Sequence, residues 1–117
     1  MKWRVEFYRT PNGRAPVEDY FDELSSSEAA KAIRALDLLR TYGTGLGMPH
    51  VRLLRGGLYE FRLRGTREHR VLYVALTHQR FLLLHAFTKK TQRTPPSEIT
   101  LAEQRYHNYL ERSGRHG

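Results

Sequence analysis

Three consecutive stretches between residues 58 and 88 have the residue pattern of β-strands, and short turns separate them. Apolar and polar residues alternate over 58–64 and 69–76, while 80–88 is almost continuously apolar, as expected of a strand inside a sheet. Glycine or polar residues fill the gaps, which are short enough to join antiparallel neighbours. These stretches therefore predict an antiparallel β-meander as the centre of the fold.

The remainder of the chain has mostly helical spacing, with apolar residues three and four positions apart. Ser27 is expected to cap the start of the longer early helix, and Gly43 its end. Thr94 is expected to cap the last helix, with Pro95 at its first position. The fold class is therefore α+β, with an N-terminal strand, a helical hairpin, the β-meander and a C-terminal helix, and with the helices packed on one face of the sheet. The expected elements outside the meander are a strand at 3–8, helices at 17–24 and 28–42, a glycine-rich loop at 43–49, a short strand at 51–54 and a helix from 95 to about 110.

The length of 117 residues fits a single domain, which we place at 1–113, followed by a short tail at 114–117. Because the chain has no cysteine, it forms no disulfide and offers no thiolate nucleophile or metal ligand. No apolar run approaches the roughly 20 residues that span a membrane, and no signal peptide is apparent. Histidine, aspartate and glutamate do not cluster with the spacing of metal ligands. We therefore expect a cytoplasmic protein without metal or cofactor.

The positive charge is concentrated in one third of the chain. The formal net charge is +8, and the segment 51–93 holds ten basic but two acidic side chains, while the residues before and after it are balanced. A solvated basic surface that serves solubility is one interpretation. Because the same segment is also apolar, its charges must instead sit on a structured sheet, and two acids within it cannot neutralise ten cations. We therefore expect this segment to bind the phosphates of RNA.

The strongest candidates for phosphate contact lie on neighbouring strands. Glu60, Arg62 and Arg64 fall on one face of the strand at 58–64, since side chains alternate along a strand. Arg70 of the next strand is expected to reach the same face. Arginine stays charged and grips phosphate with two hydrogen bonds, so contact with phosphate is favoured. The alternative for Arg62 and Arg70 is a structural ion pair with Glu60 or Glu68.

Cleavage of RNA without a metal needs a base for the 2′-hydroxyl, a cation for the phosphorane and an acid for the leaving 5′-oxygen. His85 has the chemistry of either acid or base, and Lys89 or Lys90 is a second candidate. The alternatives are a hydrogen-bonded core histidine and a pair of solubilising lysines at a strand end. The expected catalytic residues are Arg62, Arg70, His85, Lys89 and Lys90, and the expected RNA-binding residues are Arg52, Arg55, Arg64, Arg67 and Arg93.

Three short motifs follow one another along the second half of the chain. They are Leu54-x3-Leu58-Tyr59-Glu60-Phe61-Arg62, then His69-Arg70-Val71-Leu72-Tyr73, then Leu84-His85-Ala86-Phe87-x-Lys89-Lys90-Thr91-x2-Thr94-Pro95, with Glu98 and Ala102 following. In this order and spacing the motifs resemble the phage-derived HigB-like branch of the RelE/ParE toxin superfamily. The resemblance extends from Trp3 to about Tyr109 and implies a RelE-like fold.

This resemblance implies the toxin of a type II toxin–antitoxin system that cleaves mRNA in the ribosomal A site. The implied partners are the ribosome, mRNA and a helix-turn-helix antitoxin of the HigA kind, and the positions that match the family are the five expected catalytic residues. Two alternatives stay open. The ParE branch shares the fold and inhibits DNA gyrase, and a module that binds nucleic acid without cleaving it would have the same charge pattern.

Overall fold

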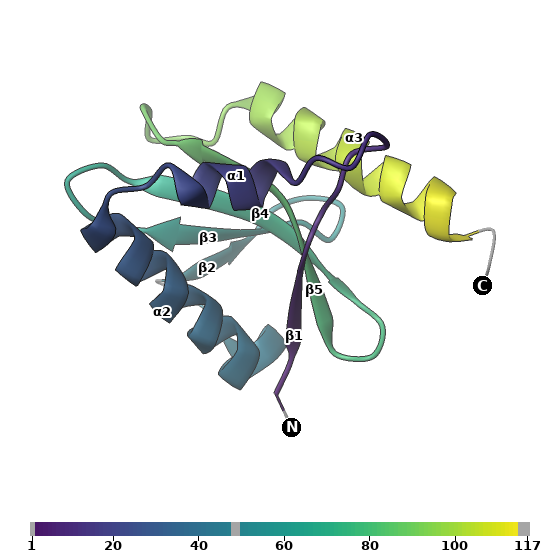
Figure 1. Cartoon of the computed structure of the whole chain (residues 1–117), viewed down its shortest axis with the longest axis horizontal. Helices are drawn as coiled ribbons and strands as arrows, with labels where there is room; N and C mark the ends of the chain where they lie inside the picture. The colour runs from purple at the N-terminus through teal and green to yellow at the C-terminus, as the bar shows by residue number, and fades with distance from the viewer. Residues whose placement is uncertain (1, 48–49, 115–117) are drawn as a thin grey trace.

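The computed structural model describes residues 2–47 and 50–114, and within these ranges it is an α+β fold with three α-helices around one five-stranded sheet (Figure 1). Residues 48–49 of the predicted glycine-rich loop and 115–117 of the predicted tail lie outside the described residues. Among the described helices, none is both long and apolar enough to cross a membrane. The elements are β1 (Arg4–Phe7), α1 (Pro16–Asp22), α2 (Ser26–Tyr42), a 3₁₀ turn η1 (Gly43–Gly45), β2 (Val51–Leu53), β3 (Tyr59–Leu63), β4 (His69–Leu76), β5 (Arg80–Thr88) and α3 (Pro96–Ser113).

The sheet has the order β1-β5-β4-β3-β2. The predicted antiparallel meander is formed by β3, β4 and β5, and the short strand β2 extends it by pairing antiparallel with β3. β1 lies on the other side of β5 and runs parallel to it, with Arg4 opposite Arg80, so the sheet is mixed. The apolar run 80–88 is therefore an interior strand, as predicted.

Helices cover both faces of the sheet, so the prediction that all of them pack on one face is wrong. α1 and α2 lie over one face, with Val71 and Tyr73 beneath them. α3 covers the opposite face, where Leu72 and Val74 meet its Ala102 (Figure 1). β4 and β5 carry apolar side chains on both faces, and a third helix is needed to remove the second face from water.

The caps of α2 fix where the helical hairpin turns. Ser25, not Ser27, is the N-cap: its Oγ accepts from the backbone N–H of Glu28, and the Glu28 carboxylate accepts from the backbone N–H of Ser25. This capping box satisfies two otherwise unpaired amides. Gly43 is the C-cap, as predicted, with φ of 57°. A Cβ at Gly43 would lie 2.2 Å from Trp3 Nε1, so glycine is also required by packing.

α3 begins one residue later than predicted. Pro95 is its N-cap and Pro96 its first residue, while Thr94 makes no capping hydrogen bond. The buried Thr94 hydroxyl instead donates to the carboxylate of Glu60 on β3. Thr94, which was expected to cap the helix, therefore donates its hydrogen bond to the buried Glu60 carboxylate of the sheet instead.

A bulge in β5 decides which way its histidine faces. Leu72 of β4 is opposite His85, and Tyr73 is opposite Leu83, so Leu84 is an extra residue in β5. The extra residue interrupts the strict alternation of side chains, and Leu84 and its neighbour His85 both face α3.

Candidate functional site

Arg70 is buried inside the protein. Its side chain is 2% exposed and forms ion pairs with Glu60 of β3 and with Glu68. Glu60 is fully buried, and its second oxygen accepts from Thr94. The structure thus places Arg70 in the structural ion pair, which was the alternative interpretation of the sequence, out of reach of a phosphate on the surface.

Two further predicted catalytic residues extend this buried cluster. Arg62 lies opposite Arg70 in the sheet, with its Nε 4.0 Å from Glu60 Oε1. This Nε is buried and makes no hydrogen bond with any described residue. Lys89 Nζ lies 3.4 Å from Glu68 Oε2. Burial opposes ionisation of Glu68, but its hydrogen bonds with Arg70 and Lys89 outweigh this and lower its pKa. The cluster joins three cations to two carboxylates.

His85 has both ring nitrogens engaged by α3. Its Nε2 lies 2.7 Å from Glu98 Oε1, and its Nδ1 lies 3.3 Å from Arg105 Nη1. Because arginine can donate but not accept, we assign Nδ1 as the acceptor and place the proton on Nε2, which donates to Glu98. Burial lowers the pKa of His85 and outweighs the opposite effect of Glu98. This geometry corresponds to a neutral, hydrogen-bonded histidine that ties β5 to α3.

Several surface arginines of the basic segment are paired with helices. Arg67 forms two hydrogen bonds with Glu28 of α2, at 3.1 and 2.9 Å. Arg55 forms two with Glu103 of α3, at 3.2 and 3.0 Å. The inference that the excess cations of 51–93 are left unmatched is therefore corrected in part, because carboxylates from outside the segment pair with some of them.

The cations without such partners are fewer and are exposed. Among the described residues, four of the ten basic side chains of 51–93 have no carboxylate within 4.0 Å. Each is exposed, so its charge is available to a ligand. They are Arg52, Arg64, Lys90 and Arg93.

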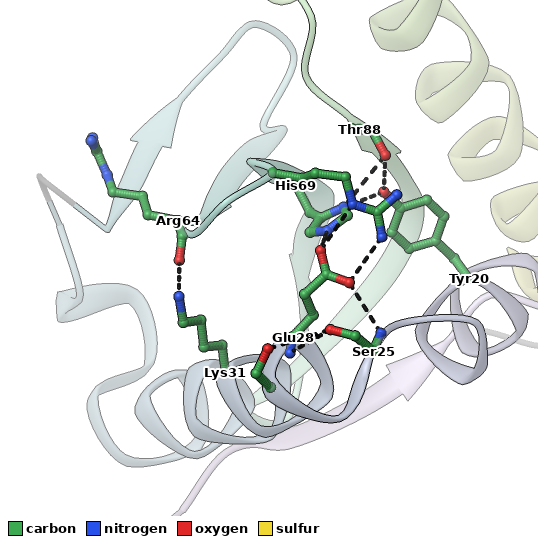
Figure 2. Close-up of polar contacts among 9 residues, drawn as sticks. Tyr20, Ser25, Glu28, Lys31, Arg64, His69 and Thr88 are labelled. Carbon is green, nitrogen blue, oxygen red and sulfur yellow. Dashed lines mark hydrogen bonds and ion pairs between the residues drawn. The ribbon is translucent and has the colours of Figure 1, made fainter.

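One of these cations belongs to an open groove between α2 and the end of β3, which we call the cationic groove. Its volume is about 280 Å³. Lys31 Nζ bridges the two walls, donating to the backbone oxygen of Arg64 at 2.7 Å, while the Arg64 guanidinium points away from Lys31 (Figure 2). No carboxylate is among the described residues that line the groove. Its lining residues are Lys31, Arg34, Ala35, Leu38, His50, Phe61, Arg62, Leu63 and Arg64.

The cationic groove has an aromatic wall beside its charges. The ring of His50 stacks on Phe61, with centroids 6.3 Å apart and planes 26° from parallel. Stacked rings beside arginine and lysine are the elements with which proteins hold single-stranded nucleic acid. Lys31, Arg34 and His50 were not predicted from the sequence, because all three lie outside the basic segment. The spacing of Lys31 and Arg34, one turn apart on α2, is the signal that could have found them.

A metal site receives no support from the side chains in the described part of the chain, where no three histidine, aspartate or glutamate residues are grouped to hold an ion.

A family model described as phage derived protein Gp49-like (DUF891) matches residues 19–107. That family is toxin-like and is related to toxins of the RelE and HigB type. No curated protein matches the chain significantly.

Proposed function

This chain belongs to the Gp49-like family of phage-derived proteins, and we propose that it is the toxin of a type II toxin–antitoxin pair that cleaves mRNA on the ribosome. The toxin-like character of the family supports the first part. The HigB-like motifs of the sequence support the choice of mRNA, of the ribosome and of a helix-turn-helix antitoxin as partner. A target in translation sets the site of action in the cytoplasm.

The cationic groove is the observation that carries RNA binding. Three exposed cations, Lys31, Arg34 and Arg64, are among its lining residues, and no carboxylate is among the described ones, so a phosphate that enters is attracted by each of them. Arg34 and Arg64 are exposed, and neither has an acid within salt-bridge distance in the part of the chain that the structure describes. The stacked rings of His50 and Phe61 provide a surface for an unpaired base. We assign Arg34 and Arg64 to this contact, because the Arg62 side chain lies with Glu60 on the other face of the sheet.

The other predicted residues then take different parts. Arg52 on β2 and Arg93 between β5 and α3 are exposed and add to the positive charge of the surface. Arg55 and Arg67 lie in turns of the sheet and pair with Glu103 of α3 and Glu28 of α2, so their contribution to RNA binding is indirect. Arg70 and His85 are also engaged by carboxylates, so we assign them a role in stabilising the fold.

The experiment combines cleavage with binding. Purified protein added to translating ribosomes should produce mapped breaks in the mRNA. Arg34→Glu and Arg64→Glu should weaken RNA binding and reduce the slope of log K against log salt by about 0.7 for each phosphate that is no longer neutralised. Arg14→Glu, an exposed arginine outside the groove, is the matched control for the change in net charge. Intact mRNA, or equally weakened binding in all three variants, would contradict the proposal.

A further inference from the structure

A tyrosine, a histidine and a glutamate form a hydrogen-bonded chain beneath α1 and α2. The hydroxyl of Tyr20 on α1 lies 2.5 Å from His69 Nδ1 on β4, and His69 Nε2 lies 2.7 Å from Glu28 Oε2 on α2. His69 is almost fully buried. Figure 2 shows the histidine between the tyrosine and the glutamate, with Thr88 beside the tyrosine hydroxyl. The order of groups is that of a nucleophile-activating triad, with a tyrosine hydroxyl at its open end.

The hydrogen bonds determine where the protons lie. Hydrogen bonds from Arg67 and then from His69 hold the pKa of Glu28 far below its usual range, so Glu28 is a carboxylate and can accept but not donate. His69 Nε2 therefore carries a proton, and we assign its Nδ1 as the acceptor of the Tyr20 hydroxyl proton. The Thr88 hydroxyl, 2.8 Å away, then donates to the Tyr20 oxygen.

The open end of this chain faces a second cleft. Tyr20 lines an open cleft of about 460 Å³ between α1, the end of β5 and the start of α3. Lys90 also lines it, and is exposed without a carboxylate within salt-bridge distance among the described residues. Glu98 is the carboxylate of this cleft, and the N–H of His85 engages one of its oxygens. A purely structural link between α1 and the sheet would not require the tyrosine to border a cleft that also holds a free cation.

We propose that this cleft is the reaction centre of the RNA cleavage described above, with Tyr20 as general base and Lys90 as general acid. The proposal rests on the proposed function. His69 and Glu28 are positioning residues that receive and stabilise the proton.

The reaction is a transesterification and needs no oxidant or other co-reactant. The 2′-hydroxyl proton passes to Tyr20 Oη as the Tyr20 proton passes to His69 Nδ1, and the 2′-oxygen forms a bond to phosphorus. The bond from phosphorus to the 5′-oxygen breaks, and the Lys90 ammonium protonates that oxygen. The products are a 2′,3′-cyclic phosphate and a 5′-hydroxyl, and solvent returns the proton from His69 to Lys90. Burial raises the pKa of Tyr20, which keeps it a phenol until the proton moves.

Two variants and one modified substrate separate the base from the acid. Tyr20→Phe keeps the ring against His69 and removes the hydroxyl, and Lys90→Met removes the ammonium. Each should reduce mRNA cleavage at saturating RNA by about 10²- to 10⁴-fold, and Tyr20→Phe should leave RNA binding unchanged. In a substrate with sulfur in place of the leaving 5′-oxygen, the leaving group is a thiolate. It needs no protonation to depart, because thiols have a pKa of about 8.5. This substrate should restore cleavage by Lys90→Met but not by Tyr20→Phe.

The positioning role is tested with Glu28→Gln, since glutamine keeps the capping box. This variant should lower kcat by at least about tenfold with unchanged KM, because a neutral partner stabilises the His69 imidazolium poorly. Glu111→Gln, an exposed glutamate near the end of α3, is the matched control.

Breaks produced at the wild-type rate by Tyr20→Phe would overturn this inference and leave the proposed function intact. Absence of breaks with the wild-type protein would overturn both.

Discussion

Replacing Arg70 with methionine tests whether the buried ion pair of the sheet is structural. Methionine keeps most of the volume of the side chain but removes its charge. Glu60, which is fully buried, would then keep its hydrogen bond from Thr94 and one guanidinium, that of Arg62, at 4.0 Å. A carboxylate in this position would then have only the more distant Arg62 as a counter-charge.

The magnitude follows from the burial of both partners, which are 2% and 0% exposed. Removing one partner of a buried pair costs about 3–5 kcal/mol, because the remaining charge is uncompensated. With an unfolding entropy of about 2.1 cal/mol/K per residue over 117 residues, this corresponds to a fall in Tm of about 12–20 °C. Glu60→Gln should cost less, because Arg70 keeps Glu68 and the amide can still accept from Thr94.

Urea unfolding followed by circular dichroism gives the free energies of the two single variants and of the double variant. We expect the double variant to be more stable than the sum of the two single effects predicts, because it leaves no unpaired carboxylate at position 60. A destabilisation below about 1 kcal/mol for Arg70→Met, together with weaker RNA binding, would refute the reasoning and restore Arg70 as a phosphate ligand.

Three further predictions concern stability. Hydrogen bonds from Arg67 and others lower the pKa of Glu28 in the folded protein. The stabilising contribution of Glu28 is therefore complete above the unfolded pKa of about 4.3 and is lost progressively as the pH falls from there through the folded pKa. The free energy of unfolding in urea should therefore differ less between pH 7 and pH 3 for Glu28→Gln than for wild type. Gly43→Ala should cost about 2–5 kcal/mol, from a positive φ and overlap with Trp3, and calorimetry showing an unchanged Tm would contradict the packing described. Arg55→Ala should leave the urea midpoint nearly at its wild-type value, since its ion pair is exposed, and a chemical denaturation curve with a midpoint as low as that of Arg70→Met would disprove this.

The meander was predictable from sequence because its signal is local. β4 and β5 have the bounds that their apolar patterns indicate, and the turns between them are short. The placement of β1 beside β5 was not predictable, since a parallel pair depends on residues far apart in the chain. The position of α3 had a signal in the unbroken apolar run of 80–88, which indicates burial on both faces.

The candidate site was less accessible to sequence reasoning, because charge alone does not show which cations are paired. The carboxylates that engage Arg55 and Arg67 lie 48 and 39 residues away in the chain. Tyr20 and His69 are 49 residues apart, and their contact depends on how α1 crosses the sheet. The bulge at Leu84 turns His85 toward α3, so the chemistry available to it depended on one extra residue in a strand.

The parallel pairing of β1 with β5 also has a consequence for synthesis of the chain. β5 begins 76 residues after β1, from Arg4 to Arg80. At about 5–20 residues per second, β1 waits about 4–15 s on the translating ribosome for the strand it pairs with. α1 and α2 are made in that interval, but neither has the sheet face it covers. The cleft lined by Tyr20 and Lys90 therefore forms only after β5 has emerged, when most of the protein has been translated.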